Sequence, residues 1–334
     1  MSDSILTVRN LQKKYGDHEV VKGISFSVKE GEVFGLLGPN GAGKTQTISM
    51  LTGVIEPTAG TAEIGGYDIR KQMNKVKEIN GLVPQDLALY PTLSARANLN
   101  FFGRIYGLRG KDLKERVEDV LRIVSLTDRA DDAVEKYSGG MKRRVNIAAG
   151  LVHHPRLFFL DEPTVGVDPQ SRNHIFESVQ RLNRERGMSI VYTSHYMEEV
   201  EMLCDRVAII DNGEIIALDT IPNLIAMLGG GVIHVGVQKV NDELLQNIRQ
   251  LPGVKQAAIA SQLVGPLPTE GEAADAPPTP TNPVIKVEAH KSQEALINLL
   301  RFFNDCDVHV VSLKVLEPNL ENVFLHLTGK KLRE

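Results

Sequence analysis

Residues 38–45 have the sequence GPNGAGKT and constrain the fold more than any other part of the chain. They match the phosphate-binding loop pattern G-x-x-x-x-G-K-[ST] at all four fixed positions. The apolar run at residues 33–37 predicts a buried strand before the loop, and the apolar positions of residues 47–51 predict a helix after it. Strand, loop and helix in this order predict an α/β nucleotide-binding domain.

The residue types of this loop suit a triphosphate, which carries several negative charges. Glycines let backbone N–H groups converge on phosphate oxygens, and the positive end of the following helix adds its field. Lys44 is placed to reach the β- and γ-phosphates, and the hydroxyl of Thr45 can ligate Mg²⁺. The loop residues expected to bind the nucleotide are Gly38, Pro39, Asn40, Gly41, Ala42, Gly43, Lys44 and Thr45.

Length and composition favour two globular domains without a nucleic-acid surface. A chain of 334 residues exceeds one average domain, and its formal charge of -4 offers no basic excess for binding phosphate backbones. Residues 1–10 lack the pattern of a signal peptide, and no run reaches the roughly 18 to 20 apolar residues that span a bilayer. We therefore expect any role at a membrane to depend on a partner.

The regions on either side of the loop predict an antiparallel N-terminal sheet and a helical insert. Short apolar patterns at residues 6–11 and 20–28 are typical of strands joined by turns. Tyr15 lies between them, where its ring either packs locally or stacks on a nucleotide base. Residues 86–136 show apolar positions at helical spacing, with charges between them.

A second anion site is predicted where Ser138, Gly139 and Gly140 precede an apolar helix. Serine is a favoured helix N-cap, and the exposed N–H groups of a helix start attract anions. An ordinary helix cap remains the alternative.

Two further polar groups follow apolar strands. Asp161 and Glu162 end the run at residues 157–160, at the strand end where open parallel sheets bind ligands. Asp161 is suited to hold Mg²⁺ through water, and Glu162 to orient or deprotonate an attacking water. His195 ends another β-rich run, and it could donate a hydrogen bond to a γ-phosphate.

Taken together, these residues resemble the nucleotide-binding subunit of an ABC transporter over residues 5–220. The resemblance implies a RecA-like core with an antiparallel β subdomain and a helical subdomain at about residues 86–150. It implies Mg²⁺-dependent ATP hydrolysis by a head-to-tail dimer of this chain with a second copy or a homologous subunit. It is carried by residues 38–45, Gln85, Ser138, Gly139, Gly140, residues 157–162, Asp168 and His195.

The resemblance also assigns roles to single residues. Tyr15 would stack on adenine, and Gln85 would contact Mg²⁺ and sense the membrane partner. The segment from Ser138 to Gly140 would touch the γ-phosphate bound opposite. Asp168 would couple the two sites, and His195 would read the γ-phosphate.

Three positions depart from the family pattern. Met141 stands where glutamine is common, residues 165–168 vary the usual segment, and Gln46 replaces a common second hydroxyl beside the nucleotide. None of these changes removes a group assigned to chemistry.

A smaller α+β domain is expected after a linker at residues 221–231. The order β-α-β, loop, β-α-β over residues 232–334 predicts a ferredoxin-like accessory or regulatory domain, with a disordered proline-rich loop at residues 265–283. The ending at residues 316–324 resembles extensions on ATPases of ABC-2 type exporters. We hypothesise that this domain stabilises or regulates the dimer.

The sequence therefore predicts a peripheral ATPase on the cytoplasmic face of the cell membrane, driving export through a separately encoded multi-span permease. A soluble ABC-type ATPase acting as a mechanical switch on ribosomes or DNA is the alternative. The single set of motifs and the short helical insert favour transport. A small-molecule kinase would leave Ser138 to Gly140 unexplained. The transported substrate cannot be read from this chain.

Overall fold

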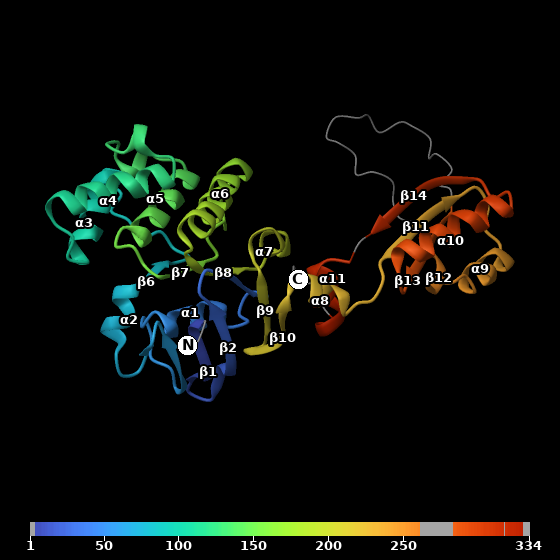
Figure 1. Ribbon diagram of the computed structural model, residues 1–334, viewed down its shortest axis with the longest axis horizontal. Helices are drawn as coiled ribbons and strands as arrows, with labels where there is room; N and C mark the ends of the chain where they lie inside the picture. Colours follow the sequence, from blue (N-terminus) through green and yellow to red (C-terminus); the bar gives the residue numbers. More distant parts are fainter. Residues whose placement is uncertain (1–3, 261–282, 317, 330–334) are drawn as a thin grey trace. The chain divides into compact units, whose positions relative to one another are not determined.

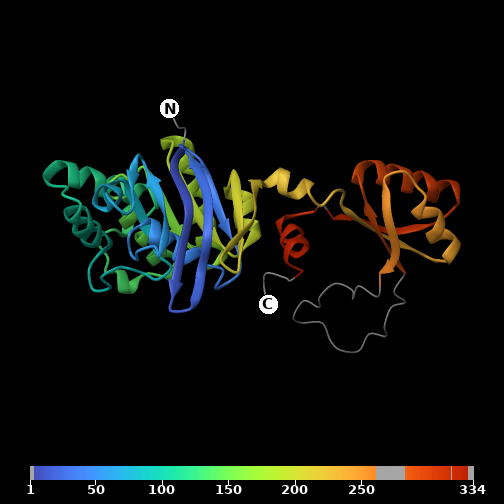
Figure 2. The same ribbon diagram turned by 90° about the horizontal axis from the view of Figure 1, so that it is seen from below.

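The computed structural model describes residues 4–260, 283–316 and 318–329, and these form two compact units (Figures 1 and 2). Among the described residues, the first unit takes in residues 4–221 and 327–329, and the second takes in those between Pro222 and His326. The expected linker at residues 221–231 contains a short helix, α8 (Ile221–Ala226). Each unit is considered by itself below.

The first unit begins with the antiparallel sheet expected from the sequence. Its strand order is β2-β1-β4-β5, and β1 pairs with both β2 and β4. Gly60 has a φ of 72°, and a Cβ there would lie 1.9 Å from the carbonyl oxygen of Asn10, so only glycine lets β4 approach β1. The strands are β1 (Ser4–Tyr15), β2 (His18–Lys29), β4 (Ala59–Ile64) and β5 (Tyr67–Asp68).

A six-stranded sheet forms the centre of the first unit, in the order β10-β9-β3-β8-β7-β6. Every pairing from β9 to β6 is parallel, and β10 joins antiparallel to β9. Strands β3, β7 and β8 are buried along their whole length, as expected where helices cover both faces of a parallel sheet. The strands are β3 (Val33–Leu37), β6 (Asn80–Val83), β7 (Leu157–Asp161), β8 (Ser189–Ser194), β9 (Arg206–Asp211) and β10 (Glu214–Thr220).

Helix α1 (Lys44–Leu51) connects these two sheets. Its apolar side chains join a core that includes residues from the antiparallel sheet and from β3, β7, β8 and β9. The rings of Phe26 and Phe34 stack at 5.2 Å within this core. The helix that follows the phosphate loop therefore packs into the core that the two sheets share.

The predicted helical insert begins later than expected. Ser94 accepts a hydrogen bond from the backbone N–H of Ala97 and starts helix α3, so residues 86–94 are not helical. The helices α3, α4 and α5 group together at one side of the unit (Figure 1). The segments are α3 (Ala95–Ile105), α4 (Gly110–Ile123), η1 (Thr127–Arg129), η2 (Val134–Lys136) and α5 (Gly139–Leu151), and the other helices of this unit are α2 (Met73–Ile79), α6 (Pro169–Arg186) and α7 (Met197–Leu203).

The second unit has the predicted ferredoxin-like topology. Its strands lie in the order β12-β13-β11-β14, with antiparallel pairings throughout, and one helix follows each of β11 and β13. The α/β fold class and the added α+β domain are therefore confirmed. The elements are β11 (Val232–Val237), α9 (Asp242–Arg249), β12 (Val254–Ala260), β13 (Val284–Ala289), α10 (Ser292–Asp305), β14 (Val310–Leu316) and α11 (Leu320–Thr328).

Helices α9 and α10 cover one face of this four-stranded sheet. Ile233, Val235, Ile285 and Val287 alternate along the two central strands and pack in one core with residues of both helices. The predicted disordered loop at residues 265–283 lies outside the described residues except for Pro283.

Candidate nucleotide and catalytic site

The phosphate loop lies between β3 and α1, the context predicted from its sequence. Gly43, at the start of α1, has a φ of 101°, in the left-handed region that glycine tolerates best. Gly38 passes so close to β9 that a Cβ would lie 2.2 Å from the carbonyl oxygen of Ile210. These glycines let the loop wrap around the start of the helix.

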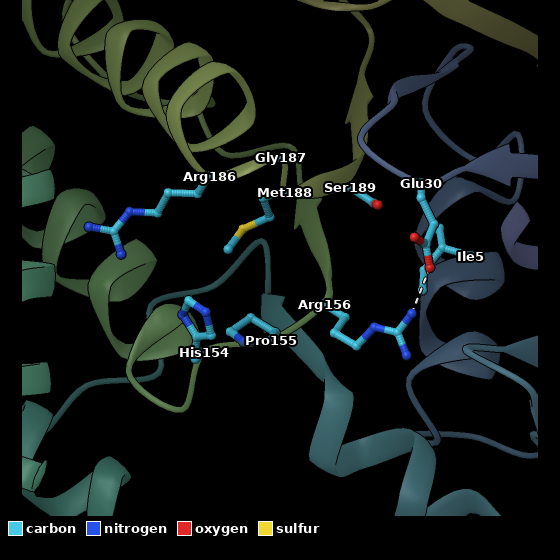
Figure 3. Close-up of a pocket in the computed structure, with 9 residues that line it drawn as sticks. All are labelled: Ile5, Glu30, His154, Pro155, Arg156, Arg186, Gly187, Met188 and Ser189. Atoms are coloured by element: carbon cyan, nitrogen blue, oxygen red, sulfur yellow. Dashed lines mark hydrogen bonds and ion pairs between the residues drawn. The ribbon is translucent and has the colours of Figure 1, made fainter. Parts of the chain in front are cut away.

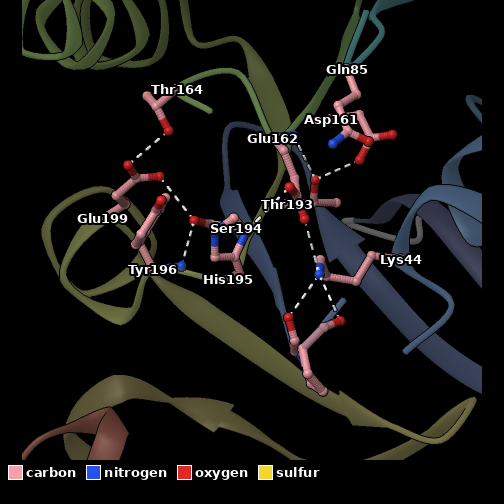
Figure 4. A network of polar contacts seen from close by, with 12 residues as sticks. Lys44, Gln85, Asp161, Glu162, Thr164, Thr193, Ser194, His195, Tyr196 and Glu199 are labelled. Carbon is pink, nitrogen blue, oxygen red and sulfur yellow. Dashed lines mark hydrogen bonds and ion pairs between the residues drawn. The ribbon is translucent and has the colours of Figure 1, made fainter. Parts of the chain in front are cut away.

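Lys44 is buried, with 3% of its surface exposed, and its ammonium group has three oxygen partners. It donates to the carbonyl oxygens of Gly38 at 2.7 Å and Pro39 at 3.0 Å. Its Nζ also lies 3.1 Å from Oε1 of Glu162 (Figure 4). The charge therefore stays within the loop and is paired with the carboxylate at the end of β7.

Asp161 and Glu162 leave the carboxyl end of β7 in different environments. The hydroxyl of Thr193 donates to Oδ1 of Asp161 at 2.8 Å and accepts from the backbone N–H of Glu162 at 2.9 Å. Burial raises the pKa of Asp161, and hydrogen bonds from the hydroxyls of Thr193 and Thr45 partly oppose this effect. Glu162 has a φ of 45°, an uncommon conformation for a residue with a side chain and one that often occurs at functional sites.

His195 follows β8 and lies beside the same carboxylate. Its Nδ1 is 3.2 Å from Oε2 of Glu162, whose Oε1 holds Lys44 (Figure 4). The structure thus brings together the predicted residues Lys44, Glu162 and His195, which come from three separate segments of the chain.

These residues line a pocket of about 550 Å³ at the carboxyl ends of the parallel strands. Thr45 and Gln85 line the pocket as well. Asp161 accepts a hydrogen bond from Thr45, so the three groups predicted to bind Mg²⁺, which are Thr45, Gln85 and Asp161, lie together. They supply the oxygen atoms that Mg²⁺ prefers, and Mg²⁺ commonly completes its shell with water and phosphate. No group of three or more His, Cys, Asp or Glu side chains forms a metal site within the described residues. The lining residues are Val20, Asn40, Gly41, Gly43, Lys44, Thr45, Gln46, Gln85, Glu162, Val165 and His195.

Tyr15 and Gln46 make a direct contact beside this pocket. The hydroxyl of Tyr15 donates to Oε1 of Gln46 at 2.8 Å, and the Nζ of Lys13 lies 4.9 Å from the centre of the Tyr15 ring. The residue is 49% exposed, which leaves part of its surface accessible to a ligand. Gln46, one of the three departures from the family pattern, therefore holds the hydroxyl of this ring.

The segment from Ser138 to Gly140 is not part of the Lys44 pocket. The side chain of Ser138 accepts from the N–H of Met141 at 3.2 Å and caps α5, while Ser138 and Gly139 are exposed. Gly140 lies against the start of α6, where a Cβ would be 3.3 Å from Oδ2 of Asp168. Asp168 itself caps α6 through the N–H of Ser171 at 2.9 Å.

Two buried groups that support the site were not identified from the sequence. The first is Glu199 on α7, which is 2% exposed and accepts hydrogen bonds from three hydroxyls, of which those of Thr164 and Ser194 are labelled in Figure 4. The donors are Thr164 at 2.7 Å, Tyr192 at 2.9 Å and Ser194 at 2.9 Å. This carboxylate joins the segment after Glu162 to the segment before His195. Burial and the charge of Glu199 raise the pKa of Tyr192 well above its usual value.

Arg143 on α5 is the second supporting group. It is 5% exposed and donates to the carbonyl oxygens of Pro84 at 2.9 Å, Gln85 at 2.7 Å and Glu162 at 3.4 Å. Burial lowers the pKa of its guanidinium group. Helix α5 is therefore tied to both the Gln85 segment and the end of β7. The only signal in the sequence was a basic residue after the two glycines.

A smaller hollow of about 160 Å³ lies near the amino ends of β7 and β8 (Figure 3). Its wall includes Arg156 and Glu30, which form an ion pair at 2.6 Å. None of the predicted site residues lines it. Ligands of open α/β sheets bind at the opposite, carboxyl ends of the strands, so the larger pocket is the candidate site.

Comparison with known proteins gives consistent results for the sequence and the fold. Residues 21–165 match the family described as "ABC transporter". The chain is 49% identical over 331 residues to the "Linearmycin resistance ATP-binding protein LnrL" of Bacillus subtilis (strain 168), covering 99% of this chain and 100% of that protein. It is 36% identical over 334 residues to the "Nod factor export ATP-binding protein I" of Ralstonia nicotianae (strain ATCC BAA-1114 / GMI1000), covering 100% and 96%.

A solved structure resembles the first unit. It is described as "Dimeric structure of a post-hydrolysis state of the ATP-binding cassette MJ0796 bound to ADP and Pi", and it has a TM-score of 0.59 and 24% identity. The match covers 64% of this chain and 98% of that one, and it supports the fold.

Proposed function

This chain belongs to the ATP-binding proteins of ABC transporters, and we propose that it hydrolyses ATP to power export through a separate membrane permease. The observation that carries the ATPase part is the position of Glu162 between Lys44 and His195 in the larger pocket. We assign the ATPase to residues 1–220 and an accessory role to residues 232–334.

Nucleotide binding would begin with an exchange of partners at Lys44. Its ammonium group now bonds two loop carbonyls and Glu162, and a triphosphate offers a stronger anionic partner. Binding would therefore draw Lys44 toward the phosphates and free one oxygen of Glu162. The buried lysine links occupancy of the loop to the availability of the catalytic carboxylate.

Hydrolysis would then use the freed carboxylate as a base for water. Glu162 would orient or deprotonate the attacking water, and His195, 3.2 Å away, would hold the carboxylate and contact the γ-phosphate. Thr45, Gln85 and Asp161 would hold Mg²⁺, which neutralises charge on the phosphates when bound. Burial raises the pKa of Asp161, so a cation beside it would favour the ionised carboxylate.

The working unit would be a head-to-tail dimer. Ser138 and Gly139 are exposed at the start of α5 and do not line the pocket of their own chain. A helix start with free N–H groups binds anions, so a second copy would place this segment on the γ-phosphate held by the first. Asp168 lies beside Gly140 and would connect the two sites.

The proposals of export and of a membrane location are supported by the relatives rather than by this chain alone. One relative is named for resistance to linearmycin and another for export of Nod factor. Within residues 4–260, 283–316 and 318–329, no helix has the length and apolar character to cross a bilayer. We propose that the protein docks on a permease at the cytoplasmic face of the membrane.

Purification of tagged Glu162→Gln protein from detergent-solubilised native cells in the presence of ATP tests this proposal. We expect a multi-span membrane protein at matched stoichiometry, because slowed hydrolysis would hold the assembled state. The exposed neighbour Glu198 supplies the control variant Glu198→Gln, which carries the same change of charge. Recovery of ribosomal or DNA-associated proteins in place of a permease would reject export.

The contact between Tyr15 and Gln46 predicts an effect on ATP affinity. Tyr15→Phe removes the hydroxyl that bonds Gln46 but keeps the ring, so we expect KM for ATP to rise about threefold with kcat unchanged. Tyr15→Ala also removes the stacking surface and should raise KM by about tenfold or more. Steady-state kinetics with Tyr67→Phe, a tyrosine of the same sheet outside the pocket, provides the control. An unchanged KM in both Tyr15 variants would show that the ring does not contact the base.

A further inference from the structure

The face of the accessory sheet opposite to α9 and α10 carries charged side chains. Residues of β11 and β13 alternate, so that Ile233 and Val287 enter the core while His234 and Lys286 lie on the other face. This face is partly exposed within the described residues. It belongs to the second unit, and the nucleotide site does not include it.

Three basic residues form a row across this face. His234 of β11 pairs in register with Lys286 of β13 on one side and with Lys314 of β14 on the other. The two lysines therefore place positive charges on the same face, one on each side of His234. Burial, and after it the charges of these two lysines, lower the pKa of His234, which favours the neutral form of its imidazole.

One carboxylate partly neutralises this row. Glu288 lies two residues along β13 and accepts from Nζ of Lys286 at 2.8 Å. The pair is about two fifths exposed, with 43% of the Lys286 side chain and 36% of the Glu288 side chain accessible. An exposed ion pair of this kind is weak, so a better anion can compete for Lys286.

A pocket of about 530 Å³ opens beside these side chains, within the second unit. His234, Lys255, Lys286 and Glu288 line it on the sheet side, and Asn319, with Asn322 and His326 of α11, adds further polar groups. The other lining residues, which include Leu228 and Leu316, are apolar or glycine. The volume lies within the range of roughly 300 to 1,000 Å³ that is typical of sites for small molecules. An apolar wall with a few convergent charges suits a ligand that has an apolar body and an anionic group.

We propose that this pocket of the accessory domain binds a small amphipathic organic anion. The anionic group would lie between Lys286 and Lys255, where it would replace Glu288 as the partner of Lys286. The apolar body would cover the side chains of Leu228 and Leu316. This site is separate from the nucleotide pocket, and its occupant need not be a nucleotide.

The probe 8-anilinonaphthalene-1-sulfonate has this chemistry and becomes fluorescent in apolar surroundings. We expect the full-length protein, with ADP saturating the nucleotide site, to bind it at one site. Lys286→Gln should weaken binding by about tenfold, because a charge-assisted contact is lost. Glu288→Gln should strengthen binding about threefold, because it removes the competing carboxylate. Lys255→Gln, from a different strand, should weaken binding independently.

The opposite signs expected for Lys286→Gln and Glu288→Gln distinguish this site from unspecific binding to apolar surface. Lys239→Gln provides the matched control, since Lys239 is exposed in the same unit and does not line the pocket. Circular dichroism shows whether each variant is folded. Equal affinities in the wild type and in the Lys255, Lys286 and Glu288 variants would overturn the proposal. Probe that binds the nucleotide-free protein but no longer binds once ADP is added would overturn it too, because the probe would then occupy the ATPase site. These outcomes do not depend on the proposed ATPase activity, because the experiment measures binding of the probe. If the protein did not hydrolyse ATP, the proposed anion site could still be tested in this way.

Discussion

Glu162→Gln is expected to lower ATP turnover by about 100-fold or more while the protein still binds ATP. A general base contributes roughly 10² to 10⁴ in rate, and glutamine keeps the shape of the side chain but cannot accept the proton from water. Glu162 is the carboxylate that lies within 3.2 Å of both Lys44 and His195, so its loss removes the base without emptying the pocket. With hydrolysis slowed, we expect the ATP-bound dimer to accumulate.

Two measurements test this expectation. Phosphate release at saturating ATP gives turnover, and light scattering with and without ATP gives the fraction of dimer. Glu198→Gln, on the exposed side of α7, should behave as the wild type in both. Turnover of the Glu162 variant at the rate of the wild type would contradict the assignment of the base.

Lys44→Ala is expected to abolish measurable ATP binding and to lower stability. Two lost charge-assisted hydrogen bonds to phosphate correspond to a Kd roughly 100-fold higher or more. The change also leaves Glu162, which is 5% exposed, without the partner at 3.1 Å. A buried carboxylate that loses its partner costs about 3 kcal/mol of unfolding free energy.

The double variant Lys44→Ala with Glu162→Gln separates these two effects. It removes the carboxylate charge that Lys44 no longer balances, so thermal unfolding should move back toward that of the wild type, whereas calorimetric titration should still show no ATP binding. If the double variant also regained ATP binding, the phosphate contact of Lys44 would be rejected. If Lys44→Ala unfolded at the temperature of the wild type, the buried ion pair would not contribute to stability.

Most of the fold could be predicted because its signals are local. The loop at residues 38–45 needs a strand before it and a helix after it, and the structure has β3 and α1 at these places. The alternation of Val232–Val237 and Val284–Ala289 predicted strands, and the order of elements gave the ferredoxin-like topology. The insert was predicted less well. Residues 86–94 are not helical, because Ser94 caps the first helix and no cap precedes it.

The reactive groups of the site could also be predicted from short stretches of sequence. Each of them, Lys44, Asp161, Glu162 and His195, stands at the end of a strand or in a motif. The contacts that support these groups could not be predicted in this way. Glu199 and Arg143 looked like ordinary charged residues of two helices. Their burial and their hydrogen bonds arise only when segments distant in the chain pack together.

The sequence by itself determined which groups are available to bind phosphate and to activate water, because the geometry of a loop and the end of a strand depend on neighbouring residues. Only the tertiary structure decided which of these groups meet. Parallel pairing of β3, β7 and β8 puts Lys44, Glu162 and His195 around one pocket, and leaves Ser138 and Gly139 exposed outside it. It also decided that His234 lies between two lysines, because cross-strand register is set by long-range pairing and core packing.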